Sequence, residues 1–277
     1  MNILIIAPHQ DDEILATGGL IQKCVKLGDI VTVLFVTNGD YRGPHIAQKR
    51  YYESKDALTL LGIDEKNIFY LGYGDTGMNY SHSFLRQLLF RNSNTPLTTP
   101  FSSMTYHPAG SETVHAIRTG FESPLTQESF LTDLEWFIKK LNPDMIIAPN
   151  VLDMHGDHSA IIPLLQKIIF FSQIPICLTY IIHGGNDSLW PPRDAKTFTC
   201  PPVVSVETWK SRISIPLTDL EQCKKNKAIL NFATQLKDDS NNFLVSFSKQ
   251  EEIFFLLRNN EINRQNIYNH FGYRENP

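Results

Sequence analysis

Two groups of histidine and carboxylate side chains, far apart in the chain, have residue types and spacing suited to catalysis. In sequence order they are His9, Asp11, Asp12 and Glu13, and then Asp153, His155, Asp157 and His158. A catalytic zinc site uses three nitrogen or oxygen ligands of this kind and keeps one position open. A carboxylate and a histidine left over from that set suit a general base and a general acid. Together the two groups predict metal-assisted hydrolysis.

Each group comes shortly after an apolar run that is typical of a buried strand. Residues 3–6 precede the first group, and residues 145–148 precede the second. Continuous apolar runs are typical of parallel strands covered on both faces, and ligands bind at the carboxyl ends of such strands. We therefore expect the two groups to meet at one edge of a sheet.

Other interpretations of the same residues compete with a metal site. The acidic residues 11–13 would also cap a helix and complement its dipole. Two histidines three positions apart, such as His155 and His158, are often ordinary surface residues. Both groups follow a predicted strand, and this shared position favours the metal site. A dinucleotide site is disfavoured, because the first turn lacks the glycine-rich pattern and its acidic side chains would repel a phosphate.

The surrounding sequence alternates strand-like and helix-like segments. The expected strands are 2–7, 30–37, 67–71, 144–149 and 176–182, with a short one near 203–206. The expected helices are 13–28, 47–61, 127–141 and 158–172, with two more near 218–234 and 249–258. This alternation predicts a Rossmann-like α/β fold: a mainly parallel sheet, helices on both faces, and the metal site at the carboxyl ends of the strands.

Residues 79–124 interrupt the alternation and are rich in Ser, Thr, Pro and Asn. A long loop in a compact domain is either functional or disordered, so we expect an inserted, loop-rich segment near the substrate. Residues 183–277 form a variable C-terminal part without a motif of their own. The length of 277 residues fits one domain over 1–277.

Composition narrows the classes of partner. The net charge of −4 and the pI near 6.1 argue against a nucleic-acid surface, and no apolar stretch reaches the length of a membrane span. The four cysteines lack a C-x-x-C pair and are expected to be reduced thiols. We expect a cytoplasmic protein that acts on a small molecule, and homo-oligomerisation stays open.

At these motifs the sequence resembles the LmbE-like, or PIG-L-type, deacetylases, which are zinc-dependent and act on N-acetylglucosamine-containing substrates. The family pattern A-H-P-D-D-E is matched by residues 7–13, Ala-Pro-His-Gln-Asp-Asp-Glu, with the proline on the other side of the histidine. The pattern H-x-D-H is matched by residues 155–158, and residues 50–62 and 71–78 resemble two further family segments. The likeness runs through residues 2–182 apart from 79–124 and is weak beyond 183.

The resemblance implies a ligand set and a base. The implied ligands of Zn²⁺ are His9, Asp12 and His158, and another divalent metal also suits a set of this kind. Asp11 would be the general base that takes a proton from the attacking water. Glu13 is left with the role of supporting the start of the helix.

The resemblance also implies roles for four other residues. His155 would protonate the leaving amine or stabilise the oxyanion, and Asp157 would orient His155. Arg50 and Asp75 would hold sugar hydroxyls. Without the resemblance, Arg50 is explained by an i, i+3 pair with Glu53 on a solvated helix face, and Asp75 by a turn.

One family feature is missing. Some members supply a tyrosine close before H-x-D-H, where this chain has Asp153 and Met154. Residues that could replace it, contact substrate or stack on a sugar are Tyr106, His107, His115, His183, Arg118 and Trp190. For each of these, an exposed-loop or packing role is the simpler expectation.

The predicted activity is hydrolysis of an N-acetyl group from an amino sugar or its conjugate. A zinc-dependent amidohydrolase of a non-sugar amide or thiol conjugate is an alternative enzyme. A non-catalytic sugar- or metal-binding relative is an alternative of another class. It is disfavoured because binding alone would need neither Asp11 nor His155.

Overall fold

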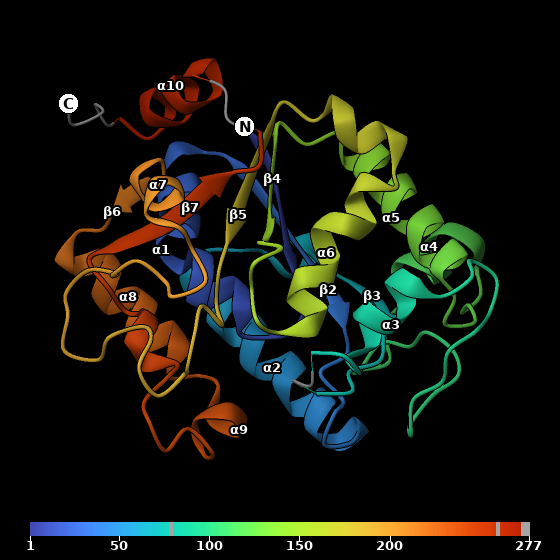
Figure 1. Ribbon diagram of the computed structural model, residues 1–277. Helices are drawn as coiled ribbons and strands as arrows, with labels where there is room; N and C mark the ends of the chain where they lie inside the picture. Colours follow the sequence, from blue (N-terminus) through green and yellow to red (C-terminus); the bar gives the residue numbers. More distant parts are fainter. Residues whose placement is uncertain (78–79, 259–260, 273–277) are drawn as a thin grey trace.

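The computed structural model describes residues 1–77, 80–258 and 261–272, so Met78 of the family-like 71–78 segment lies outside it. At its centre is a seven-stranded sheet of order β3-β2-β1-β4-β5-β7-β6 (Figure 1). The strands are β1 (Asn2–Ala7), β2 (Ile30–Thr37), β3 (Ile68–Tyr73), β4 (Met145–Pro149), β5 (Ile176–Tyr180), β6 (Ile213–Pro216) and β7 (Glu251–Leu256). Strands β1 to β5 are parallel, and β7 pairs antiparallel with β5 and β6. The predicted mainly parallel α/β fold is confirmed.

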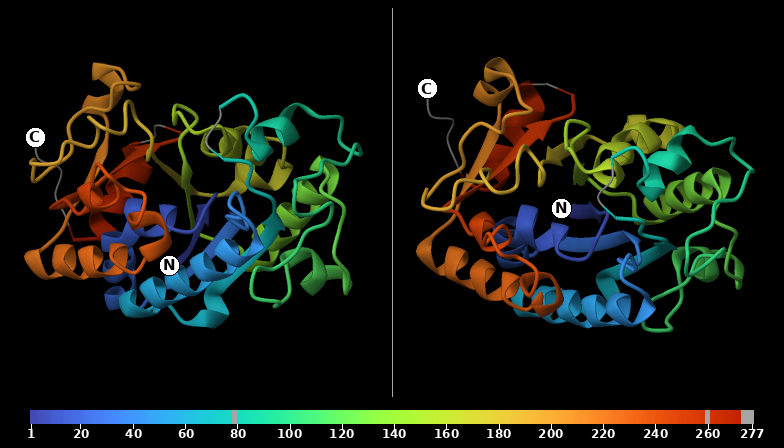
Figure 2. Two further views of the ribbon diagram at one scale, coloured as in Figure 1. Left: turned by 90° about the horizontal axis from the view of Figure 1, so that it is seen from below. Right: turned by 60° about the horizontal axis from the view of Figure 1, so that its bottom comes forward.

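Helices cover both faces of the sheet (Figure 2). They are α1 (Asp12–Leu27), α2 (Pro44–Leu61), α3 (Phe84–Phe90), α4 (Val114–Thr119), α5 (Gln127–Leu141), α6 (Gly156–Gln166), α7 (Val206–Lys210), α8 (Asp219–Ile229), α9 (Ala233–Leu236) and α10 (Glu261–His270). Because strand side chains alternate between faces, β1 feeds two cores. Ile3 and Ile5 join the core formed with α1, α2 and α8, while Leu4 and Ile6 join the core formed with α3, α5 and α6.

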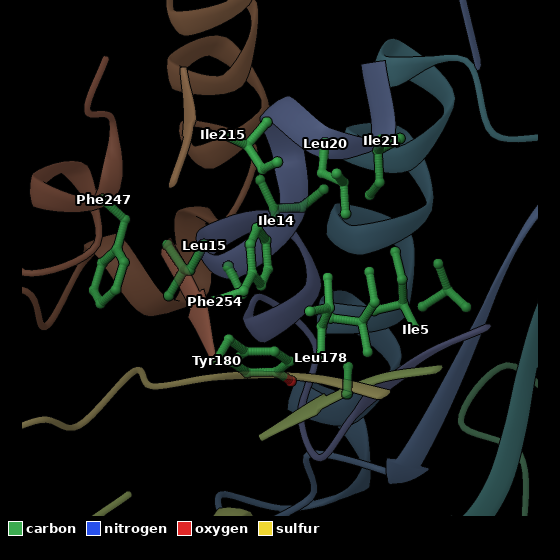
Figure 3. Packing of buried hydrophobic residues seen from close by; sticks show 14 of the residues in the cluster. Ile5, Ile14, Leu15, Leu20, Ile21, Leu178, Tyr180, Ile215, Phe247 and Phe254 are labelled. Atoms are coloured by element: carbon green, nitrogen blue, oxygen red, sulfur yellow. The ribbon is translucent and has the colours of Figure 1, made fainter. Parts of the chain in front are cut away.

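Figure 3 shows how the first core holds α1 against the sheet. Ile14 and Leu20 of α1 lie in one buried cluster with Ile5 of β1, Leu178 of β5 and Phe254 of β7. Full burial of a side chain of this size contributes about 1.5–3 kcal/mol. The packing fixes the first turn of α1 just beyond the carboxyl end of β1, where the first group of polar residues lies.

The sequence prediction was wrong in the C-terminal part. Residues 249–258 contain strand β7 instead of a helix, and residues 203–205 form no strand and lead into α7, which begins at Val206. Ile253, Phe254 and Phe255 are all buried in the sheet. A short apolar run without alternation does not distinguish a doubly covered strand from a buried helix, so the pattern carried no information to decide between them. The other expected elements are found with ends shifted by a few residues, although α6 ends at Gln166.

Most described positions of residues 79–124 lie outside helices and strands, and whether the segment is an insertion stays a prediction. Its described part, residues 80–124, contains the short helices α3 and α4, and isolated bridges link Leu97 to Leu125 and Met104 to Pro124. Within the described ranges, no helix has the length and apolar character needed to cross a membrane.

A buried ion pair connects the C-terminal elements to the middle of α1. The ammonium of Lys225 in α8 lies 2.6 Å from the carboxylate of Glu252 in β7, and both side chains are inaccessible to solvent. The Glu252 carboxylate accepts from the backbone N–H groups of Gly19 and Leu20 at 2.6 and 2.8 Å. Lys225 donates to the carbonyl of Leu15 at 2.8 Å. Both charged groups of the pair therefore also form hydrogen bonds with the backbone of α1.

Replacing Lys225 with methionine is expected to lower the free energy of unfolding by about 3–5 kcal/mol, because Glu252 would remain a buried charge without its counter-ion. Chemical denaturation measures this loss. Lys139→Met is the control, since it removes a much more exposed pair with Glu135 and should cost less than about 1 kcal/mol. Equal losses in the two variants would contradict the role of the buried pair.

Candidate metal centre

The sheet brings the two polar groups together. Strands β1 and β4 are neighbours, with Ile5 opposite Ile147, so the segments that follow them share one edge. His9 lies in the turn after β1, and Asp12 is the first residue of α1. His158 lies in the first turn of α6. The side chains therefore converge at the amino ends of two helices and the carboxyl ends of two parallel strands.

Three donor atoms form a nearly equilateral triangle. Nδ1 of His9 lies 3.4 Å from Oδ2 of Asp12, and Nε2 of His158 lies 3.2 Å from the same oxygen. The two ring nitrogens are 3.3 Å apart. Tetrahedral zinc ligands at about 2.0–2.2 Å from the ion lie about 3.3–3.6 Å from one another. The donor set and its spacing therefore fit a tetrahedral divalent metal.

The cluster contains more candidate ligands than one ion requires. The sets His9, His155, His158 and His9, Asp75, Asp157 also have donor atoms within 4.8 Å of one another. The set with Asp12 has its three donor atoms 3.2 to 3.4 Å apart and combines two imidazoles with one carboxylate, which suits a dication. His9, Asp12 and His158 are therefore the first candidate ligands, and the other members are candidates for roles around them.

The electrostatics of the cluster also favour a cation. Burial lowers the pKa of His9, but the carboxylates of Asp75, Asp12 and Asp157 outweigh it and raise the pKa to about 10. Burial likewise opposes protonation of His158, yet Asp12 and Asp153 raise its pKa well above the ordinary value. Without a metal, protons on the two imidazoles compensate the carboxylates. A metal that binds there replaces these protons, so its affinity rises with pH.

Each candidate ligand histidine has a carboxylate beside its other ring nitrogen. Nδ1 of His158 contacts Asp153 at 3.2 Å, and Nε2 of His9 contacts Asp157 at 3.2 Å. Asp153 itself accepts from the backbone N–H groups of His155, Ile182 and His183. Such partners fix the ring orientation and tautomer of a metal ligand. The sequence analysis included Asp153 in the second polar group without giving it a role. Its contact with His158 indicates that it orients this ring.

The expected pairing of the Asp157 carboxylate with His155 is wrong. One carboxylate oxygen accepts from the backbone N–H of Leu85 at 2.7 Å, and the other faces His9. Only the backbone N–H of Asp157 reaches His155, donating to Nδ1 at 3.1 Å. The Asp157 carboxylate therefore faces His9, which belongs to the first polar group, and not His155 of its own group.

His155 is the N-cap of α6, and this fixes its protonation. Because Nδ1 accepts a backbone hydrogen bond, the hydrogen of the neutral ring sits on Nε2. Burial lowers the pKa of His155, and His9, His158 and His183 lower it further. The geometry therefore presents His155 as a neutral hydrogen-bond donor.

Asp11 has an unusual backbone at the start of α1. Its φ is 131°, a region that L residues rarely adopt, and its side chain makes no capping bond. Its N–H donates to Glu13 at 2.9 Å, and the other oxygen of Glu13 accepts from Ser54 of α2 at 2.7 Å. Burial raises the pKa of Asp11 to about 6 against the opposing charge of Arg50, 3.5 Å away. The strain thus lies at the candidate base.

Arg50 and Asp75 both reach the cluster. Arg50 donates to the carbonyl of Gln10 at 2.8 Å and lies 3.9 Å from Asp75. The alternative pair of Arg50 with Glu53 is wrong, because Glu53 accepts from the backbone N–H and hydroxyl of Thr234. Gln10 is buried and donates to the Thr37 carbonyl, so the residue in place of the family proline supports the turn.

A cavity of about 520 Å³ opens above these residues. The cluster members lining it are His9, Asp11, Asp12, Arg50, Asp75 and His155. The outer lining comes from Tyr41 and Arg42, from residues 182–187 and from residues 235–244. No residue of 80–124 lines it, so the expected proximity of that segment to the substrate stays a prediction. The C-terminal segments, which had no motif, form the outer wall.

The remaining sequence candidates mostly have structural partners. His115 and Arg118 both bind Asp133, and Trp190 is buried. The Tyr106 hydroxyl donates to Asp40 at 2.7 Å.

Two other candidate histidines have different surroundings. Nδ1 of His107 accepts from the backbone N–H groups of Ala109 and Ser111, outside the main cavity. His183 is the one member of this group that lines the cavity.

Asp11→Gly and Asp11→Ala remove the same carboxylate but differ in backbone freedom. We expect the free energy of unfolding of the glycine variant to exceed that of the alanine variant by about 1 kcal/mol or more. Only glycine adopts a φ of 131° without strain. Denaturant titration of both proteins measures the difference. A less stable glycine variant would show that the backbone is not strained.

Comparisons with known proteins agree with the fold and the motifs. A family model described as PIG-L: GlcNAc-PI de-N-acetylase matches residues 4–169. A diacetylchitobiose deacetylase of Thermococcus kodakarensis is 32% identical over 94 residues, which are 31% of this chain and 34% of that protein. The match thus spans about a third of the curated relative.

Solved structures show the same architecture. The zinc-inhibited form of a teicoplanin deacetylase superimposes with a TM-score of 0.56 at 13% identity and covers 92% of this chain and 97% of that chain. An N,N'-diacetylchitobiose deacetylase from Pyrococcus horikoshii gives a TM-score of 0.51 at 18% identity and covers 92% and 83%. At these identities the likeness concerns the fold. The matched family model spans more than half of the chain and includes both polar groups, and the protein therefore belongs to the PIG-L (LmbE-like) family.

Proposed function

We propose that this protein hydrolyses the N-acetyl group of an N-acetylglucosamine-containing sugar or sugar conjugate, with a divalent metal held by His9, Asp12 and His158. Zn²⁺ is the first candidate ion. Family membership and the diacetylchitobiose deacetylase relative support the reaction class. The observation that carries the proposal is the donor triangle at the base of a cavity that Asp11 also lines.

A bound metal would supply a Lewis acid and lower the pKa of a water in its open position. Asp11 is placed to take the proton of the attacking water. Its pKa near 6 suits a base that must also release that proton. Arg50 keeps the carboxylate charged at neutral pH and holds the adjacent backbone.

The acetamide carbonyl gains negative charge as water attacks. A donor that is already oriented stabilises that charge without reorganisation. His155 meets this description, because its Nδ1 is occupied and Nε2 carries the hydrogen. The leaving amine needs a proton, and the proton acquired by Asp11 is available for it. The geometry thus supports His155 as the oxyanion donor in preference to the acid.

Arg50 and Asp75 are proposed to bind the sugar. Both line the cavity beside Asp11, and the buried Nε of Arg50 has no hydrogen-bond partner within the described residues. An unpaired buried donor is costly unless a ligand satisfies it. A sugar hydroxyl that bridges Arg50 and Asp75 would supply an acceptor to one and a donor to the other.

Acetate release tests the reaction. The protein loaded with Zn²⁺, Mn²⁺ or Co²⁺ should release acetate from N-acetylglucosamine or diacetylchitobiose, and the chelated protein should not. Turnover of non-sugar N-acetyl amides alone would indicate the amidohydrolase alternative. Sugar binding by the metal-loaded protein without turnover would indicate a non-catalytic relative.

Two substitutions should separate metal binding from proton transfer. His158→Ala is expected to lose the metal, because it removes one of three ligands. Asp11→Ala should keep the metal and lower kcat by about 10²–10⁴-fold. Metal content by elemental analysis and kcat by acetate release are the two readouts. An Asp11→Ala protein with unchanged kcat would exclude Asp11 as the base.

The carboxylate behind His9 is expected to tune metal affinity. Asp157→Asn should weaken metal binding by about 10–100-fold, since it removes the anionic partner of the Nε2 hydrogen. Competition with a chromogenic chelator measures this. Asp133→Asn is the matched control, a buried carboxylate paired with His115 that is not part of the cluster, and it should leave the affinity unchanged. Equal affinities for the two variants would argue against this contact.

A further inference from the structure

The cavity has a deep end and a rim with different chemistry. At the deep end, the side chains of His9 and Asp12 are only 8% and 4% exposed. Toward the rim, Asp187 is 30% and Asp238 is 60% exposed. The acetamido group must lie at the deep end to reach the proposed metal. The remainder of the substrate therefore extends toward Asp187 and Asp238.

We propose that Asp187 selects substrates by charge: the part of the substrate beyond the acetylated sugar is uncharged or positively charged, and conjugates that carry phosphate or carboxylate there are disfavoured. This inference rests on the proposed deacetylase function and specifies its substrate class.

The charges that line the cavity are unbalanced. Six carboxylates and two guanidinium groups line it among the described residues, and no lysine does. Arg50 lies between Asp11 and Asp75. Arg42 pairs with Asp238 and donates to the Thr234 carbonyl. Both guanidinium charges are therefore already opposed by carboxylates, and neither is an uncompensated cation for an anionic group of the substrate.

Asp187 is the least compensated of the outer carboxylates. One of its oxygens contacts Nδ1 of His183 at 2.9 Å, while Oδ1 is buried and has no hydrogen-bond partner within the described ranges. The nearby Arg193 donates to the backbone carbonyl of Asp187 and to that of Asn241. By contrast, Asp239 accepts two backbone hydrogen bonds.

His183 extends the same preference toward the reacting centre. Its ring lies between His155, 5.5 Å away, and Phe243, on which it stacks at 5.3 Å. With its Nδ1 hydrogen directed at Asp187, a neutral His183 presents Nε2 as an acceptor. This wall therefore offers acceptors to the ligand, which suit hydroxyl and ammonium groups. A phosphate there would lose hydration without gaining a donor.

A panel of three substrates tests the proposal on the metal-loaded protein. The probes are diacetylchitobiose, its derivative with a free amine on the second sugar, and N-acetylglucosamine 1-phosphate. We expect kcat/KM for the phosphate to be at least about tenfold below that for the other two, and we expect the gap to narrow at high salt, which screens charge. Equal kcat/KM values for all three probes would overturn the proposal.

Asp187→Asn assigns the effect to a residue. The variant is nearly isosteric and should shrink the ratio of kcat/KM between the amine and phosphate probes about tenfold. Asp194→Asn, an exposed position in the same segment that does not line the cavity, makes the same change of charge and should leave the ratio unchanged. The same shift in both variants, or an unchanged ratio in Asp187→Asn, would exclude Asp187 as the selecting group.

The wild-type panel does not depend on either variant folding. If no probe is turned over under any metal, the proposed deacetylase function fails. If sugars are turned over with no dependence on charge, the function stands and the charge selection fails.

Discussion

Mutual compensation of buried charges at the carboxyl edge of the sheet is the constraint on which this protein depends. Asp12, Asp153 and Asp157 are almost fully buried around the imidazoles of His9 and His158. Buried carboxylates are costly unless a cation or hydrogen bonds compensate them. Either two protons or a divalent ion meets that requirement, so the folded chain itself requires positive charge at this edge.

The fold satisfies this constraint by holding two helix starts rigidly over adjacent strands. The first turn of α1 supplies Asp12, and the first turn of α6 supplies His158. Apolar packing positions α1 over the sheet, and the Lys225–Glu252 pair anchors its middle to β7 and α8. The variable C-terminal part thereby supports a candidate site whose proposed ligands all lie before residue 160. It also completes the wall of the cavity.

The sequence predicted what depends on local pattern. Strand ends followed by His9 and His158 identified the cluster, because parallel strands carry their carboxyl ends to one edge whatever lies between them. It did not predict that Asp157 faces His9, because that depends on the Leu85 amide, more than 70 residues away. It also predicted a helix at β7, because the apolar run of this strand lacks alternation. It gave no sign of the outer wall, because residues 235–244 are held beside the cavity by long-range contacts of Glu53 with Thr234 and of Arg42 with Asp238.

Helix α2 faces both halves of the cavity. Arg50 points from it to the backbone before Asp11, while Glu53, less than one helical turn further on, holds Thr234 at the start of the outer wall. Helix α2 thus contacts both the backbone beside the candidate base and the start of the outer cavity wall. Substitutions beyond Thr234 can change the shape and charge of the outer wall while the contacts of Arg50 and Glu53 stay in place. The outer wall can therefore vary without disturbing the backbone beside Asp11. For protein engineering under the proposed function, residues 182–187 and the segment after Thr234 are the places to alter specificity, and α2 is the element to leave intact.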